Sequence, residues 1–329
     1  MNRIYAIFDG EQCHSSLSGL CSELLSEQKL TWPDCQQGYK SLANIAVREI
    51  ACNGFNVRVQ HNPGRIRSTL ADVEEKRIKE RPCFLCQNNL PEKQRGIFYR
   101  NEYLILCNPA PVFSSHFTIC HKEHRPQSIA GHIETFLRLM LDFGEGWTVL
   151  YNGPGCGASA PDHLHFQAAP SGQMPVEEEI KEKNRLKRIA KFDGILFSKV
   201  RNAGREIIIA EGDNPASLAN AFRVILSALE KRLSAGVEPM INIAGLHSKG
   251  ARRLLIFPRT KHRPDVFFKE GNDRVAVSPA IAEMGGIIVT PVEKDFKRLG
   301  ASAIEDIFRE VSLDGEILNR FFDSITRNL

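Results

Sequence analysis

Two histidines and a glutamine stand at alternate positions near the middle of the chain. They are His163, His165 and Gln167, with Leu164 and Phe166 between them. In an extended strand alternate residues share one face, so the two imidazoles and the amide point the same way. A neutral imidazole can act as a nucleophile near pH 7, because its ordinary pKa is about 6.5. The spacing therefore predicts a strand that presents a histidine nucleophile beside an amide donor.

A loop rich in glycine and proline, residues 152–162, precedes this strand and follows an apolar run at residues 147–151. Glycine permits unusual backbone angles and close approach, so such a loop can place several N–H groups around an anion. A phosphate beside the histidine nucleophile is the chemistry that this combination predicts. The alternative is a buried strand with two hydrogen-bonded histidines behind a glycine turn, which is a common structural use of histidine.

These residues resemble the active-site signature of the histidine triad superfamily. The resemblance rests on Asn152, on residues 157–159 and on residues 163–167. A signature that ends in glutamine instead of a third histidine is similar to the branch of galactose-1-phosphate uridylyltransferase and diadenosine tetraphosphate phosphorylase. Residues 163–168 are most similar to the GDP-hexose phosphorylases, including the plant GDP-L-galactose enzymes. Further matches at residues 254–259, 278–286 and 310–313 extend the resemblance over roughly residues 55–313.

The resemblance implies a mechanism. His165 would attack the α-phosphate of a nucleoside diphosphate sugar and form a nucleotidyl-histidine, while a backbone carbonyl holds the proton of its other ring nitrogen. Gln167 would donate its amide to a phosphate oxygen, but it cannot protonate a leaving group. In the family this glutamine accompanies transfer to phosphate or to a sugar phosphate instead of hydrolysis.

The resemblance also implies residues that bind the substrate. The candidates for phosphate or substrate contacts are Asn152, Gly157, Ser159, Arg65, Arg67 and Arg81. A guanidinium group can hold a phosphate through two hydrogen bonds, although a solvated basic face would also account for the arginines. Residues 160–162 place three positions between Ser159 and His163, where the uridylyltransferases have two.

Cys83 and Cys86 have the spacing of half a zinc site. From the spacing alone they could equally form a redox pair or be two buried thiols. The family supplies two further ligands, which correspond here to His124 and His163. The resemblance thus predicts one structural zinc ion that fixes the catalytic strand.

The elements around these residues predict an α+β fold of two histidine-triad-like half-domains, each an antiparallel sheet flanked by helices. We expect a helical extension over residues 1–54, with two helices that break near Trp32 and Pro33. The catalytic half then covers residues 55–170, an exposed charged connection residues 171–192, and a second half residues 193–329. The second half repeats the outline of the first but lacks the His-x-His-x-Gln pattern, so only one half should be catalytic.

Composition limits the function classes. A net charge of +4 suits a phosphate-bearing ligand but not a nucleic-acid footprint. Nine cysteines without dense spacing suggest reduced thiols, and no apolar run approaches the ~20 residues of a membrane span. We expect a cytoplasmic enzyme whose partners are a nucleoside diphosphate sugar and inorganic phosphate or a sugar phosphate, with no nucleic acid and no membrane. A homodimer is usual among relatives, and a binding protein without turnover is the alternative of another class.

Overall fold

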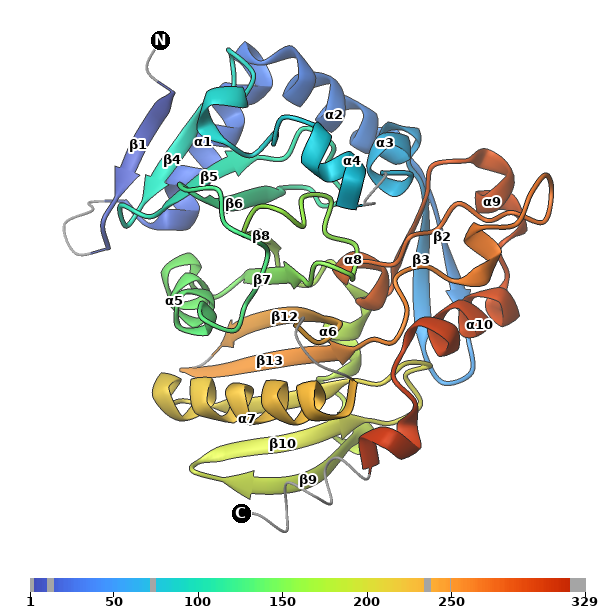
Figure 1. Ribbon diagram of the computed structural model, residues 1–329. Coiled ribbons are helices and arrows are strands. Elements are labelled where there is room, and N and C mark those ends of the chain that lie inside the picture. The colour runs from blue at the N-terminus through green and yellow to red at the C-terminus, as the bar shows by residue number, and fades with distance from the viewer. Residues whose placement is uncertain (1–2, 11–14, 72–74, 234–237, 249, 320–329) are drawn as a thin grey trace.

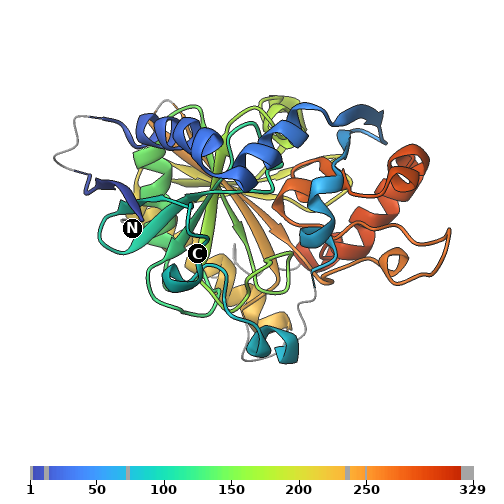
Figure 2. The same cartoon turned by 90° about the horizontal axis from the view of Figure 1, so that it is seen from above.

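The computed structural model describes residues 3–10, 15–71, 75–233, 238–248 and 250–319. Its centre is an 11-stranded sheet that runs through both halves of the chain, with a 3-stranded sheet at one side (Figures 1 and 2). In spatial order the strands of the main sheet are β1 (Ile4–Phe8), β4 (Gly96–Tyr99), β5 (Tyr103–Cys107), β6 (Phe117–His121), β8 (His165–Pro170), β7 (Trp147–Asn152), β12 (Ile241–Ser248), β13 (Ala251–Pro258), β11 (Ile208–Gly212), β10 (Ile195–Val200) and β9 (Leu186–Phe192).

The main sheet is a duplication. In the first half β4, β5 and β6 form a meander, helix α5 (Ile133–Phe143) follows, and β8 inserts between β6 and β7. In the second half β9, β10 and β11 form the same meander, helix α7 (Pro215–Leu233) follows, and β13 inserts between β11 and β12. The halves join where β7 and β12 pair antiparallel. The prediction of an α+β fold made of two similar half-domains is confirmed.

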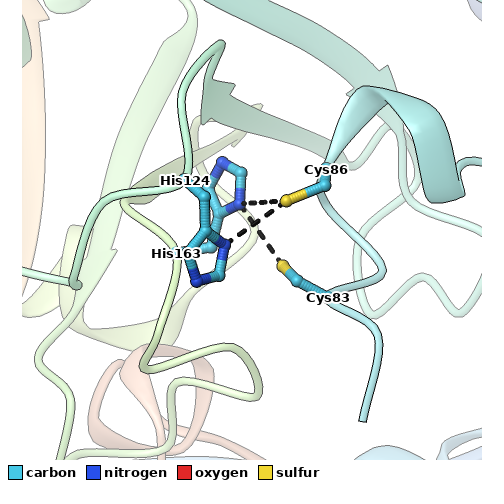
Figure 3. A group of neighbouring side chains, drawn as sticks. All are labelled: Cys83, Cys86, His124 and His163. Atoms are coloured by element: carbon cyan, nitrogen blue, oxygen red, sulfur yellow. Dashed lines mark hydrogen bonds between the residues drawn. The ribbon is translucent and has the colours of Figure 1, made fainter. Parts of the chain in front are cut away.

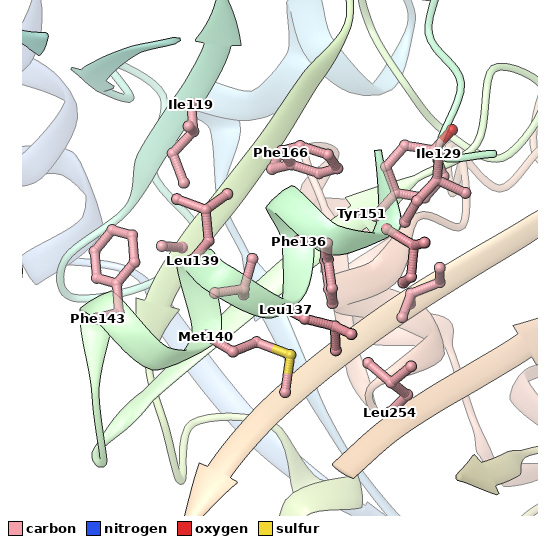
Figure 4. Packing of buried hydrophobic residues seen from close by; sticks show 14 of the residues in the cluster. Ile119, Ile129, Phe136, Leu137, Leu139, Met140, Phe143, Tyr151, Phe166 and Leu254 are labelled. Carbon is pink, nitrogen blue, oxygen red and sulfur yellow. The ribbon is translucent and has the colours of Figure 1, made fainter. Parts of the chain in front are cut away.

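One face of the main sheet is covered by α5, α7 and helix α1 (Leu17–Thr31). The apolar positions of α5 recur at helical spacing, and Gly144, with φ 78°, ends the helix in a conformation that favours glycine. Figure 4 shows Phe136 and Met140 of α5 between the strands that carry Phe166 and Leu254. Phe166 thus buries its ring on this face, and its neighbours in β8 must point to the other.

The other face carries the 3-stranded sheet and most of the short helices. That sheet has the order β14 (Ile287–Thr290), β3 (Asn56–His61) and β2 (Ala46–Ala51). The remaining α-helices are α2 (Pro33–Ala43), α3 (Ile66–Thr69), α4 (Glu75–Glu80), α6 (Pro175–Glu179), α8 (Ile281–Met284), α9 (Glu293–Arg298) and α10 (Ala301–Val311). Chain segments of both halves build this second core, so the two halves share their interior. No helix in the described ranges combines the length and apolar character of a membrane span.

The N-terminal segment is only partly helical, which corrects the expectation for residues 1–54. The two helices and their break are present, since Trp32 is extended and Pro33 begins α2. However, β1 pairs parallel with β4, and β2 pairs antiparallel with β3. These strands are fixed by partners far away in the chain, which a local hydrophobic period does not reveal. Residues 11–14 of the expected helical region lie outside the described residues.

The segment 171–192 is also less exposed than expected. Glu177 and Glu179 in α6 are buried, and Glu177 Oε1 accepts a hydrogen bond of 3.0 Å from Thr148 Oγ1. Burial raises the pKa of the Glu177 carboxyl. The run of charges predicted an exposed segment, because a charged side chain is usually solvated unless it has a buried partner, and such partners lie elsewhere in the chain.

Candidate active site

His165 and Gln167 lie on β8 and line a cavity of about 700 Å³ on the face of the sheet opposite α5. Leu164 and Phe166 are buried in the core on the other side. The alternation expected from the sequence is therefore present from Leu164 to Gln167. It does not extend to His163, because strand β8 begins at His165 and His163 is not among the residues that line the cavity.

The ring of His165 is held in one tautomer. Its Nδ1 lies 2.8 Å from the carbonyl oxygen of His163, to which an Nδ1–H donates. Nε2 is then the unprotonated nitrogen that remains for chemistry. Burial lowers the pKa of His165 to about 4, so its imidazole is neutral at pH 7.

Gln127 holds the backbone around His165 and was missed in the sequence. Its Oε1 accepts the N–H of His165 at 2.8 Å, and its Nε2 donates to the carbonyl oxygens of Asn152 and His165 at 2.8 and 3.0 Å. One buried amide thereby joins the ends of β7 and β8. No spacing rule connects a glutamine in a loop to a strand that begins 38 residues later.

His116 orients Gln167. His116 Nδ1 accepts a hydrogen bond of 3.3 Å from the N–H of Val112, so its Nε2 carries the proton and donates to Gln167 Oε1 at 2.6 Å. The amide nitrogen of Gln167 is then left to donate into the cavity. Burial lowers the pKa of His116 to about 3, which keeps this ring neutral. No motif or spacing in the sequence connects the two residues.

Arginines supply the charge of the cavity. The three arginines predicted to contact phosphate, Arg65, Arg67 and Arg81, line it, and so does Arg77. Arg65 Nη1 donates to the carbonyl oxygen of Ala110 at 2.7 Å. Within the part of the chain that the structure describes, buried Arg65 Nε and Arg81 Nη1 have no hydrogen-bond partner. Buried guanidinium donors that lack a partner are suited to an anionic ligand.

The candidates from the glycine-rich loop divide. Ser159 lines the cavity, but Asn152 and Gly157 do not. Asn152 Oδ1 instead accepts hydrogen bonds from Asn242 Nδ2 at 2.7 Å and from the N–H of Ile281 at 2.8 Å. Gly157 has φ +88°, and a Cβ there would lie 2.6 Å from Ala280 Cβ. Both residues thus fasten the loop to the C-terminal half.

The four predicted metal ligands lie together. Figure 3 shows Cys83 and Cys86 facing His124 and His163, and the four donor atoms all lie within 4.8 Å of one another. Cys83 Sγ is 3.3 Å from His163 Nδ1, and Cys86 Sγ is 3.3 Å from His124 Nδ1 and 3.6 Å from His163 Nδ1.

This group fits a tetrahedral ion. Zinc–sulfur and zinc–nitrogen bonds of about 2.3 and 2.05 Å place sulfur and nitrogen ligands about 3.5 Å apart. His163 Nε2 lies 2.7 Å from the carbonyl oxygen of His121, so Nε2 carries the proton and Nδ1 keeps its lone pair for a metal. Two cysteine thiolates and two imidazoles form one of the donor sets found in structural zinc sites.

Comparison with known proteins bears on the fold of the chain and on the families that it resembles. Residues 179–329 match the family described as "GDPGP1-like, C-terminal domain", and residues 24–170 match one described as "Domain of unknown function (DUF4922)". The structure of yeast Ap4A phosphorylase in complex with Ap4A has a TM-score of 0.58 at 12% sequence identity, over 89% of this chain and 97% of that one. This chain shares the fold of yeast Ap4A phosphorylase over most of its length. The resemblance inferred from the sequence is therefore confirmed.

Two further solved structures are similar to this chain. Another structure of yeast Ap4A phosphorylase gives a TM-score of 0.57 at 12% identity, over 89% of this chain and 94% of that one. An ADP-glucose phosphorylase from Arabidopsis thaliana with bound ADP-glucose gives a TM-score of 0.36 at 12% identity, over 82% of this chain and 100% of that one. No curated protein matches the chain in sequence.

Proposed function

We propose that this enzyme transfers a nucleotidyl group through His165, and that its reaction is the phosphorolysis of a GDP-hexose to GDP and hexose-1-phosphate. The observation that carries the proposal is the neutral ring of His165, fixed through Nδ1, in a cavity with four arginines and one acid, Asp34, among its described lining residues. Such a cavity favours a substrate with several negative charges.

In the first step the lone pair of His165 Nε2 forms a bond to the α-phosphorus, and the bond from that phosphorus to the bridging oxygen breaks. The bridging oxygen leaves with the hexose-1-phosphate and keeps the electron pair. Gln167 donates to a non-bridging oxygen as charge develops there. Because the other ring nitrogen already donates to the His163 carbonyl oxygen, the imidazole need not reorganise as it becomes positively charged.

In the second step an oxygen of inorganic phosphate attacks the same phosphorus, and the phosphorus–nitrogen bond breaks. The electron pair returns to Nε2, so the free enzyme is restored and GDP leaves. A glutamine amide can neither protonate a leaving group nor take a proton from an attacking water at neutral pH, so it suits an acceptor, inorganic phosphate, that is already an anion. The arginines Arg65 and Arg81 would neutralise the phosphates in both steps.

We propose zinc as the ion held by Cys83, Cys86, His124 and His163. When bound, it supplies a rigid cross-link without taking part in the reaction. His163 belongs to this group and also gives the carbonyl oxygen that orients His165. The ligand set therefore holds the backbone that positions the nucleophile.

The guanine base is favoured by the family model of residues 179–329, whose description names GDPGP1. Two alternative enzyme functions remain. The first, a dinucleoside polyphosphate phosphorylase or ATP adenylyltransferase, is supported by the fold shared with Ap4A phosphorylase. The second is a hexose-1-phosphate uridylyltransferase. A nucleotide-sugar binding protein without turnover is the alternative of another class.

Product analysis separates these functions. Purified protein is incubated with GDP-, ADP- or UDP-glucose or with Ap4A, each with no addition, with inorganic phosphate or with galactose-1-phosphate. The proposal expects GDP to appear from GDP-glucose only when phosphate is present. Turnover that requires galactose-1-phosphate would indicate a transferase. Product from Ap4A but from none of the nucleotide sugars would indicate a dinucleoside polyphosphate phosphorylase. Binding without any product would contradict the proposal.

A further inference from the structure

Asp162 stands between the metal-ligand group and the cavity. One carboxylate oxygen, Oδ1, lies 3.2 Å from Arg81 Nη2, and the other, Oδ2, lies 3.8 Å from His124 Nε2. The side chain of Asp162 is 18% exposed, so both interactions are partly shielded from water. A single carboxylate therefore faces a cavity arginine on one side and a metal ligand on the other.

The chain connects the same partners a second time. Arg81 and the ligand Cys83 are separated only by Pro82, and Asp162 directly precedes the ligand His163. The Asp162–Arg81 ion pair thus links two chain segments, one that carries the ligand Cys83 and one that carries the ligand His163.

Arg81 is held on one side and unpartnered on another. Its Nη2 donates to Asp162 Oδ1 and to the carbonyl oxygen of Ser159, each at 3.2 Å, and its guanidinium carbon lies 5.0 Å from the centre of the Phe84 ring. Its Nη1 is buried without a hydrogen-bond partner among the described residues. Asp162 therefore fixes the guanidinium in a position that leaves one donor for an anion.

His124 presents its two nitrogens to different neighbours. Nδ1 lies 3.3 Å from Cys86 Sγ, whereas Nε2 faces the Asp162 carboxylate. A carboxylate near Nε2 favours the tautomer with the proton on Nε2, which leaves the Nδ1 lone pair for a metal. The same residue that fixes Arg81 thus favours the metal-binding form of His124.

We infer that Asp162 couples metal binding to nucleotide binding, as a positioning residue that holds His124 and Arg81 together. A metal that fixes His124 also fixes Asp162 and, through Asp162, Arg81. Zinc and a nucleoside diphosphate such as GDP therefore strengthen each other's binding. Because such coupling is reciprocal, GDP must raise the zinc affinity by the same factor by which zinc raises the GDP affinity. The nucleotide part of this inference rests on the proposed function, whereas the metal part does not.

The test compares wild type, D162N and D162E with a control, E123Q. Glu123 also bears a carboxylate next to His124 in sequence, but it is exposed and pairs with Arg125 at 2.5 Å. D162N is nearly isosteric, and thermal unfolding checks that each variant folds. Zinc affinity is measured by chelator competition with and without GDP, and GDP affinity by calorimetry with zinc-loaded and zinc-free protein.

We expect D162N to lower zinc affinity about 10-fold and E123Q to leave it within about 2-fold of wild type, as for other partners of metal ligands. In wild type and E123Q, zinc should raise GDP affinity about 10-fold, and D162N should abolish that factor while D162E recovers part of it. Equal zinc affinities of D162N and E123Q would overturn the inference, as would a coupling factor that survives in D162N. If GDP binds none of the proteins, the proposed function fails, and the zinc affinities still decide whether Asp162 supports the metal site.

Discussion

His116 Nε2 lies 2.6 Å from Gln167 Oε1, and this hydrogen bond fixes which end of the glutamine amide faces the cavity. Without it the amide could turn its oxygen toward a phosphate, which would repel it. We expect H116A to lower kcat about 10-fold with little change in KM, because Gln167 acts on charge that develops during the reaction. Steady-state kinetics with GDP-glucose and phosphate check this.

H116Q is the matched variant, because a glutamine side chain retains an N–H donor. It should recover part of the rate lost in H116A. A rise in KM with unchanged kcat in H116A would contradict the orienting role.

Removal of the amide itself should cost more. We expect Q167A to lower the rate of nucleotidyl transfer about 100-fold, the usual effect of losing one donor to a developing oxyanion. Single-turnover experiments measure this step directly. Combining Q167A with H116A should add little, since His116 acts through Gln167, and a multiplicative loss in the double variant would show that it acts by another route.

The pKa of His116 gives a stability prediction. Burial lowers this pKa from the ordinary 6.5 to about 3, so the folded protein disfavours a proton that the unfolded chain binds. This contribution to stability is therefore complete above pH 6.5 and decreases as the pH falls toward 3. Between pH 6 and 4 the free energy of unfolding of wild type should fall about 1.4 kcal/mol per pH unit more steeply than that of H116Q.

Urea unfolding at several pH values measures this difference. His165 has a lowered pKa in both proteins, so its contribution cancels in the comparison. Parallel curves for the two proteins would show that His116 is readily protonated in the folded state.

The cavity arginines should affect substrate binding. We expect R81A to raise the KM for GDP-glucose about 10- to 100-fold, because charged hydrogen bonds to phosphate contribute about 1.5–3 kcal/mol. R81K should restore little, since an ammonium group cannot make the same two-point contact. R125A is the control, because Arg125 is exposed and paired with Glu123. Equal KM values for R81A and R125A would show that Arg81 does not bind the substrate.

The metal group predicts a difference between two cysteines. Cys83 belongs to the four-residue group, whereas the buried thiol of Cys120 donates to the carbonyl oxygen of Leu104 at 3.5 Å. C83S should lose bound zinc by elemental analysis and lower the melting temperature by roughly 5 °C or more, whereas C120S should keep the metal. If wild type contains no metal and C83S melts like wild type, the group is not a metal site.

Local pattern predicted which residues share a face of the strand. The alternation of His165 and Gln167 with Leu164 and Phe166 placed the first pair at the cavity and the second pair in the core, on opposite faces of β8. The two N-terminal helices were also visible in the pattern, because Pro33 marks the break between them. Both features depend only on residues that are close together in the sequence, so the sequence pattern alone predicts them.

Long-range partners were not visible. Residues 46–51 were expected to be helical, but they form strand β2 because they pair with β3. The hydrogen bonds of Asn152 to Asn242 and to Ile281 likewise join residues that are far apart in the chain. His116 and Gln127 gained their roles in the same way, through residues far along the chain. The topology of the second half confirmed a duplication that its residues alone left faint.

The most direct test of the proposed mechanism is the intact mass of the protein after brief mixing with GDP-, ADP- and UDP-glucose in the absence of phosphate. We expect wild type to gain the mass of one GMP unit from GDP-glucose, phosphate to remove it, and H165A to gain nothing. An unmodified wild-type protein that nevertheless binds GDP-glucose, or an adduct that persists in H165A, would contradict His165 as the nucleophile.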